Sequence, residues 1–140
     1  MARPTDYSQE LADSICELIA DGQSLRAICL SDDMPNKATV FRWLAKDVEF
    51  SDQYARAREE QAETFADELI AISDESQTTV KEHDGFTEVT YDSVAVARNR
   101  LRVDTRKWVA SKLKPKKYGD KLDLGVTGTL NYELLLKELK

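Results

Sequence analysis

The sequence predicts a mainly α-helical protein that begins with a helix-turn-helix head. The first observation behind this prediction is a pair of short helical patterns on either side of Met34-Pro35, within residues 24–46. The second is a pair of much longer helical patterns, one acidic and one basic, separated by a short β-rich segment. We therefore expect a head at 1–47, long antiparallel helices joined by a β-hairpin at 48–121, and a strand plus short helix at 122–140.

The first helix should begin behind Asp6 or Ser8, either of which can accept a backbone N–H bond as an N-cap, and run to about Ala20. Its apolar positions are Leu11, Ile15, Leu18 and Ile19. Gly22 follows the helix, as expected for a left-handed C-terminal cap.

The two short helical patterns that follow divide cleanly into apolar and polar faces. Ser24 can cap the first and Asn36 the second, while Pro35 prevents the earlier helix from continuing. The apolar positions are Leu25, Ile28 and Cys29 in the first pattern, then Val40, Trp43 and Leu44 in the second. The second pattern leaves its donors on the other face, as a recognition helix in the major groove requires. From spacing alone, a plain helical hairpin with a solvated polar face remains the alternative.

Charge does not by itself mark this head as a DNA-binding module. Residues 1–50 carry a net charge of −4, and the whole chain carries −6. A module that holds phosphates by charge alone is basic. If the head binds DNA, one copy binds weakly, and several copies are needed to raise the affinity through effective concentration.

The middle of the chain inverts its charge between two long helices. We expect the first helix from about Glu49 to Ile72 and the second from Ser93 to a point before Pro115. The net charge is −11 over residues 47–92 and +8 over residues 93–121. This inversion favours antiparallel pairing within one chain, and equally favours contact between the acidic face of one copy and the basic face of the next, which can close a ring.

A β-hairpin is expected at residues 78–91, because β-branched and aromatic residues flank Asp84-Gly85, a strong two-residue turn signal. Isolated hairpins are marginal in water, so this one should lie against helices or join strands of another copy. His83, the single histidine, should be an exposed residue beside the turn.

The C-terminal part begins with a lysine-rich stretch, residues 112–121, which is either a site of phosphate contact or a solvated linker. Its lysines are Lys112, Lys114, Lys116, Lys117 and Lys121. Residues 122–130 alternate as a half-buried strand does, and Asn131 can cap a short leucine-bearing helix. That tail suits pairing between chains or docking onto a partner.

Several kinds of site and location are not indicated. Cys16 and Cys29 fall within apolar helical patterns and should be small buried residues, and no cluster of soft ligands suggests a metal. No signal peptide is visible, and no apolar run approaches the roughly 20 residues of a membrane span. We expect no cofactor and no small-molecule substrate.

Three segments carry a resemblance to a known family: SLRAIC at 24–29, MPNKATVFRWL at 34–44, and RLRVDTRKWVASKLKPKKYGDK at 100–121. In this order they resemble the terminase small subunits of short-tailed enterobacterial double-stranded DNA phages. The resemblance implies a non-catalytic subunit that recognises the packaging initiation site on concatemeric viral DNA in the host cytoplasm. It also implies recruitment and regulation of the large terminase subunit, which holds the ATPase and nuclease, and a ring of roughly eight copies with a heterologous interface.

The same resemblance implies roles for individual residues. The residues expected to face DNA are Asn36, Lys37, Thr39 and Arg42, with Lys46 and Arg26 at phosphates. The lysines at 112–121 are a possible second DNA or phosphate contact. The charge pattern assigns the ring interface to Arg98, Arg102, Arg106, Trp108, Glu60, Glu63 and Asp67. Asp32-Asp33 departs from the expected pattern, since two acids there repel a DNA backbone unless they cap or turn away.

Three other functions are alternatives to this one. A dimeric helix-turn-helix transcription regulator would read half-sites about one DNA turn apart, but it gives no role to the charge-inverted helices. A nuclease would need a metal at Asp67-Glu68 or Asp74-Glu75, yet adjacent acids on a helix point in different directions and no nucleophile accompanies them. A structural adaptor would bind protein only.

Overall fold

The structure is a computed structural model that describes residues 2–120. It is mainly helical, with one two-stranded antiparallel sheet, as predicted. The elements in chain order are α1 (Gln9–Ala20), α2 (Leu25–Ile28), α3 (Lys37–Lys46), α4 (Val48–Asp74), β1 (Thr78–His83), β2 (Phe86–Tyr91), α5 (Ser93–Leu113) and α6 (Pro115–Tyr118). The strand and helix predicted at 122–140 lie outside the described residues.

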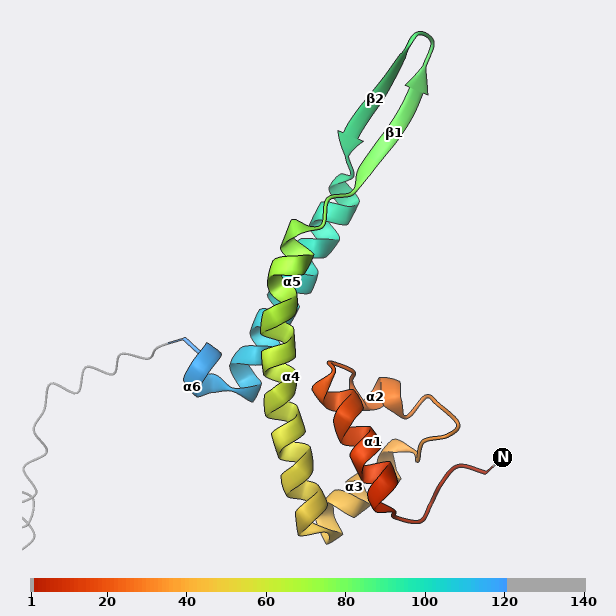
Figure 1. Ribbon diagram of the computed structural model, residues 1–140, viewed down its shortest axis with the longest axis vertical. Helices are drawn as coiled ribbons and strands as arrows, with labels where there is room; N and C mark the ends of the chain where they lie inside the picture. The colour runs from red at the N-terminus through yellow and green to blue at the C-terminus, as the bar shows by residue number, and fades with distance from the viewer. Residues whose placement is uncertain (1, 121–140) are drawn as a thin grey trace, which may run out of the picture.

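The long helices α4 and α5 form an antiparallel rod, and the smaller elements are arranged around it (Figure 1). The hairpin of β1 and β2 continues the rod at one end. Helices α1, α2 and α3 lie against the N-terminal half of α4, while α6 lies on the other side of the rod. The head is therefore well separated from the hairpin.

The predicted helix starts in the head are confirmed by side-chain caps. Ser8 accepts the Leu11 N–H at 3.2 Å, and Ser24 accepts the Ala27 N–H at 3.1 Å. These bonds satisfy backbone donors that a helix start otherwise leaves unpaired. Gly22 follows α1 with φ of +104°, which is a conformation that favours glycine.

The apolar core of the head uses α4 as one of its walls. Phe50 and Ala57 of α4 are buried together with the apolar faces of α1, α2 and α3. Tyr7 packs edge-on against Trp43, with ring centroids 5.5 Å apart, and also meets Phe50 at 5.9 Å. The core thus continues past residue 47, which is the predicted end of the head.

Polar bonds fix the end of α1 to the middle of α4. The buried Gln61 side chain donates to the Gln23 carbonyl at 2.9 Å. The Thr64 hydroxyl donates to the Ala20 carbonyl at 2.7 Å. These side chains satisfy carbonyls at a helix end that would otherwise require water. The head is consequently held at a defined height along α4.

Both cysteines are free and buried, as the apolar pattern predicted. Burial raises the pKa of the Cys16 thiol to about 11. Burial also raises the pKa of Cys29. Since the thiolate is the reactive form, both side chains act as small apolar core residues.

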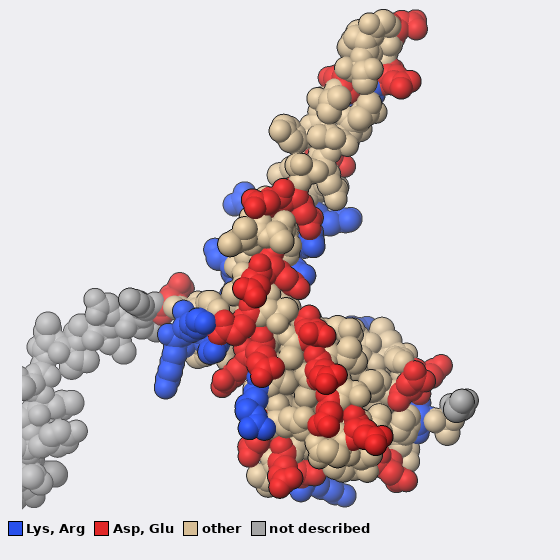
Figure 2. Space-filling model, in the orientation of Figure 1, with Lys and Arg blue, Asp and Glu red and all other residues tan. Residues whose placement is uncertain are grey.

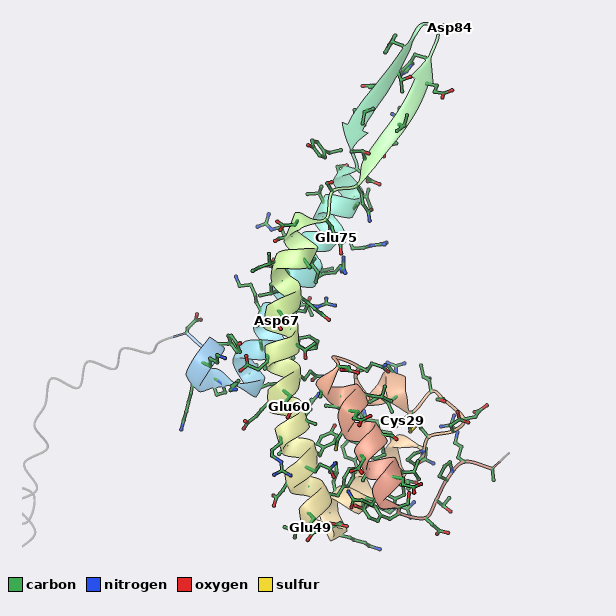
Figure 3. The ribbon with its side chains drawn as sticks, viewed as in Figure 1. Cys29, Glu49, Glu60, Asp67, Glu75 and Asp84 are labelled. Carbon is green, nitrogen blue, oxygen red and sulfur yellow. The ribbon has the colours of Figure 1, made fainter. Side chains whose placement is uncertain are left out.

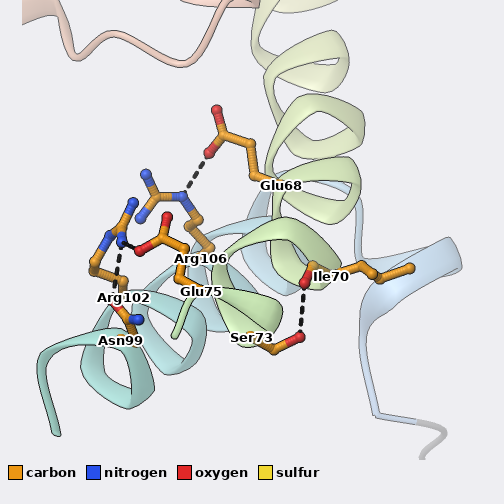
Figure 4. Close-up of polar contacts among 7 residues, drawn as sticks. All are labelled: Glu68, Ile70, Ser73, Glu75, Asn99, Arg102 and Arg106. Atoms are coloured by element: carbon orange, nitrogen blue, oxygen red, sulfur yellow. Dashed lines mark hydrogen bonds and ion pairs between the residues drawn. The ribbon is translucent and has the colours of Figure 1, made fainter. Parts of the chain in front are cut away.

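The acidic and basic helices pair within one chain. Arg106 donates to Glu68 at 2.6 Å, and Arg102 donates to Glu75 at 2.7 Å (Figure 4). Arg102 also donates to Asn99 one turn away at 3.0 Å. Of the two arrangements that the charge inversion favoured, the structure shows the pairing inside the chain.

The hairpin is confirmed with the predicted turn, and it is exposed along its whole length. Its register pairs Val80 with Val89 and Lys81 with Glu88. Every residue of both strands is exposed to solvent. Of the two environments predicted for the hairpin, burial against the helices of residues 2–120 is therefore not observed.

Candidate nucleic-acid interface

Helix α3 begins with a chain of side-chain hydrogen bonds that reaches its exposed face. The Asn36 carboxamide oxygen accepts the backbone N–H and the hydroxyl of Thr39, both at 3.0 Å. Arg42 in turn donates to the Thr39 hydroxyl at 3.1 Å. Asn36, Thr39 and Arg42 are therefore linked in sequence along one side of the helix.

Thr39 occupies a different position from the one predicted. Its exposed fraction is 2%, because it lies under the Asn36 and Arg42 side chains on the inner side of the helix. A side chain so buried does not reach a base edge in this conformation. Thr39 instead fixes the direction of the Arg42 guanidinium.

The opposite face of α3 is locked into the core, which leaves its cations outside. Val40 is fully buried and Trp43 is 8% exposed. Lys37, Arg42 and Lys46 are exposed. Within residues 2–120, none of these three cations has a carboxylate at ion-pair distance. Their charges are consequently available to an outside partner.

Phe41 is a member of this face that sequence reasoning missed. Its ring is 52% exposed, and the Lys37 ammonium lies 5.6 Å from the ring centroid. An exposed aromatic ring one position before Arg42 was visible in the sequence, but the apolar stripe at Val40 and Trp43 drew attention to the inner face. An apolar group on a recognition helix can contact a thymine methyl.

One of the two acids before α3, Asp32, is partly neutralised by the N-terminal arm. Arg3 donates to the Cys29 carbonyl at 2.7 Å and lies 3.6 Å from the Asp32 carboxylate. Asp32 itself remains 87% exposed at its side chain, so this pair is weak. Arg26, on α2, is exposed. The head thus keeps negative charge close to its cationic face.

The lysine-rich stretch divides into bound and free members. Lys114 and Lys117 donate to Glu63 of α4, at 2.7 and 2.8 Å. Lys112 lies 5.6 Å from the centre of the Trp108 ring. Lys116 is exposed. Lys121 lies outside the described residues, and the stretch as a whole is partly built into the fold.

Comparison with known proteins establishes the family. Residues 7–125 match the family model described as "Bacteriophage Sf6, terminase small subunit-like". The chain belongs to this terminase small subunit family. No curated protein sequence matches it. The resemblance inferred from the three sequence segments is thereby confirmed, and with it a role as the small subunit of a phage packaging terminase.

Solved structures agree with this assignment. Three crystal structures of single-substitution variants of the terminase small subunit gp1 from the bacterial virus Sf6 each align with this small subunit at a TM-score of 0.69. The identity is 42% for two of them and 41% for the third. Each alignment covers 90% of this chain and 87% of the other.

The residues predicted for a ring interface fall into two groups in this small subunit. Arg102, Arg106 and Glu63 pair inside the chain, as described above. The other four are exposed to solvent: Arg98, Trp108, Glu60 and Asp67. Figure 3 shows Glu60 and Asp67 along α4, between Glu49 at one end and Glu75 at the other. The second group is the more exposed of the two.

Acidic side chains follow α4 and continue over the neighbouring face of the head (Figure 2). A groove between α1 and α4 collects several of them. Its acidic and basic lining residues are Asp13, Glu17, Asp21, Arg56 and Glu60. No group of three or more metal-ligating side chains occurs within the described part of the chain. None of its helices is both long enough and apolar enough to cross a bilayer.

Helix α6 is held against α4 by hydrogen bonds to a single carboxylate. Glu63 accepts hydrogen bonds from Lys114, Lys117 and Tyr118, the last at 2.6 Å. These bonds lower the pKa of Glu63 to about 2. The stabilisation that they supply is complete above the ordinary carboxyl pKa of 4.5 and is lost as the pH falls from there towards 2.

We expect Glu63→Gln to abolish this acid transition, because a neutral amide neither titrates nor holds two ammonium groups. The measurement follows the amide NMR signal of Tyr118, whose N–H donates to the Lys114 carbonyl, from neutral pH downwards. Wild type should show a transition below pH 4.5. Glu59→Gln, at an exposed position on the same helix, is the control and should retain it. An unchanged transition in Glu63→Gln would contradict this assignment.

Proposed function

We propose that this small subunit recognises viral DNA through the exposed face of α3. The supporting observation is the set of cations there, Lys37, Arg42 and Lys46, which have no acidic partner within residues 2–120. Arg42 is held by Thr39 and Asn36, and a preoriented guanidinium loses little freedom when it binds. Arginine is the usual reader of guanine in the major groove.

In this proposal the residues of α3 have distinct tasks. Arg42 contacts a base, and Phe41 beside it offers an apolar surface to a thymine methyl. Lys37 and Lys46, with Arg26 of α2, contact phosphates, which position the head without reading sequence. Thr39 and Asn36 act through Arg42.

The negative charge of the head makes multivalency part of the proposal. A head with three free cations on α3 and nearby acids binds DNA weakly when alone. A ring that presents several heads on one rim contacts the duplex at several points, and the linked contacts raise the affinity by about two to four orders of magnitude.

The ring itself is supported by an exposed stripe on α5. Val94, Leu101 and Trp108 recur every seventh residue, hence on one helix face, and are 70%, 67% and 64% exposed. Cations flank the stripe at Arg98 and Lys112. Large exposed apolar patches with a polar rim mark interaction sites.

An acidic surface on the same chain complements the cations that flank this stripe. The groove between α1 and α4 carries more acids than bases, and Glu60 and Asp67 extend that charge along α4. Contact between two different surfaces of identical chains is heterologous and closes a ring when the rotation permits, here with roughly eight copies. We propose that the assembled ring works in the host cytoplasm, recruits the large terminase subunit and has no catalytic activity of its own.

The test of DNA recognition replaces two cations of α3. Lys37→Ala with Arg42→Ala should weaken binding to phage DNA by about 1–3 kcal/mol per head and reduce the salt dependence, since one base contact and one phosphate contact are lost. Fluorescence anisotropy with a labelled duplex measures the affinity.

The matched control removes the same charge elsewhere. Arg100→Ala with Lys107→Ala changes an arginine and a lysine that are exposed on α5, outside the head. This variant should bind DNA as wild type does, and both variants should assemble normally. Unchanged binding in the α3 variant would move the DNA site to the lysines at 112–117.

A further inference from the structure

The β1–β2 hairpin is the largest exposed feature that the functions above leave unused. Figure 1 shows it extending past the ends of α4 and α5, and Figure 3 places Asp84 at its tip. Tyr91, Val80 and Val89 lie on one face of it, and all are more than half exposed, at 75%, 57% and 61%. A two-stranded hairpin with an uncovered apolar face is marginal in water.

We propose that the hairpins of neighbouring copies pair edge to edge, so that β2 of one copy lies beside β1 of the next. This inference rests on the proposed ring and adds a second contact to it, separate from α5. The partner is a second copy of this chain because the two free edges complement each other in strand direction and in side-chain chemistry.

The direction of the strands in a ring permits this pairing. Rotation about a ring axis along the hairpins leaves every β1 pointing one way and every β2 the opposite way. Placing β2 of one copy beside β1 of the next then gives an antiparallel pair, which is the arrangement already present within each hairpin. A cyclic assembly can therefore extend the sheet without changing its hydrogen-bonding pattern.

The side chains on the two edges also match. If the new junction repeats the register of the hairpin, Val89 meets the next copy's Val80, and Glu88 meets the next copy's Lys81. Valine pairs and opposite charges across strands are both favourable. A shift of two residues would instead place Lys81 opposite Phe86 or Thr90, so charge favours the unshifted register.

The outer edges of the hairpin are open. Natural sheets shield open edges with proline, inward-pointing charges, short strands or a covering element. The two strands here are six residues each, contain no proline, and are exposed at every residue. Their charged residues Lys81 and Glu88 face each other across the hairpin. Pairing with a second copy satisfies the free backbone groups of both edges.

The test uses two variants, each with one added cysteine, that are made separately and then mixed before assembly. Val80→Cys and Val89→Cys place one thiol on β1 of some copies and one on β2 of others. Cross-strand neighbours lie about 4.5–5.5 Å apart at Cα, a range that a disulfide spans. Under mild oxidant the mixture should yield a covalent dimer, whereas neither variant should do so when oxidised alone. Cys16 and Cys29 stay in place because they are buried, and wild type reports their contribution.

The matched control combines Val89→Cys with Thr79→Cys, whose side chain lies on the other face of β1. This mixture should yield several-fold less dimer. Equal yields in both mixtures, or dimer from one variant alone, would overturn the proposed junction. Sedimentation of each mixture distinguishes a failure of the hairpin contact from a failure of the ring. A full-size assembly without the 80–89 dimer overturns the hairpin contact alone, and a failure to assemble overturns the ring together with it.

Discussion

Replacing Phe50 by alanine is expected to destabilise the head by about 3–5 kcal/mol, because it removes a buried aromatic ring and leaves a cavity. The ring is fully buried and lies 6.5 Å from Trp43 and 6.2 Å from Tyr54 between centroids. Phe50 belongs to α4, yet it fills the core of the head. Its loss should therefore loosen α1 and α3 from α4 while the α4–α5 rod persists.

Urea unfolding followed by tryptophan fluorescence measures this effect, since Trp43 lies in the affected core. Phe41→Ala is the control, because that ring is 52% exposed and its removal should cost less than about 1 kcal/mol. If both variants unfold at the same urea concentration, α4 does not form a wall of the head core.

Placing two carboxylates on the α5 stripe is expected to dissociate the assembly into single chains. Leu101→Asp with Trp108→Asp removes two apolar side chains that would be covered in the ring and buries charge at the contact, at a cost on the order of several kcal/mol per charge. Within one chain both positions are exposed, so the helical content should be unchanged.

Sedimentation velocity measures the assembly and circular dichroism the helical content. The matched control is Val48→Asp with Leu30→Asp, which adds the same two charges at apolar side chains that are 73% and 74% exposed, at the start of α4 and after α2. Its assembly should be full size. A full-size assembly in the α5 variant would place the ring interface elsewhere.

The local structure of this chain followed closely from its sequence. Ser24 and Asn36 cap the helices that they were predicted to cap, and of the two residues predicted for α1, Asp6 or Ser8, it is Ser8 that caps the helix. Capping is predictable because it depends on residues within three positions. Asp84-Gly85 likewise fixed the hairpin and its register. Helix α4 differs from its prediction by one residue at its start and two at its end, which is ordinary fraying.

The contacts that depend on long sequence separations were not predictable in detail. Nothing near Glu63 indicates that Lys114, Lys117 and Tyr118 converge on it, because the convergence depends on how α5 returns along α4. The place of Phe50 in the head core follows from the tilt of α4, which helical periodicity does not specify.

The candidate site was predicted in outline and refined by packing. The cations of α3 are exposed as expected, because the apolar stripe at Val40 and Trp43 sets the rotation of the helix. Thr39 falls just inside the boundary of that stripe, and the capping oxygen of Asn36 holds it there. A helical pattern assigns such boundary positions to either face, so only the packed structure distinguishes them.

Several weakly binding heads that act together on one duplex should be counted by native mass spectrometry of the purified chain with phage DNA. We expect one duplex bound to a closed set of roughly eight copies, which is the stoichiometry that a cyclic heterologous interface produces. One or two copies per duplex would contradict it, because a monomer or dimer cannot supply the linked contacts that an acidic head requires.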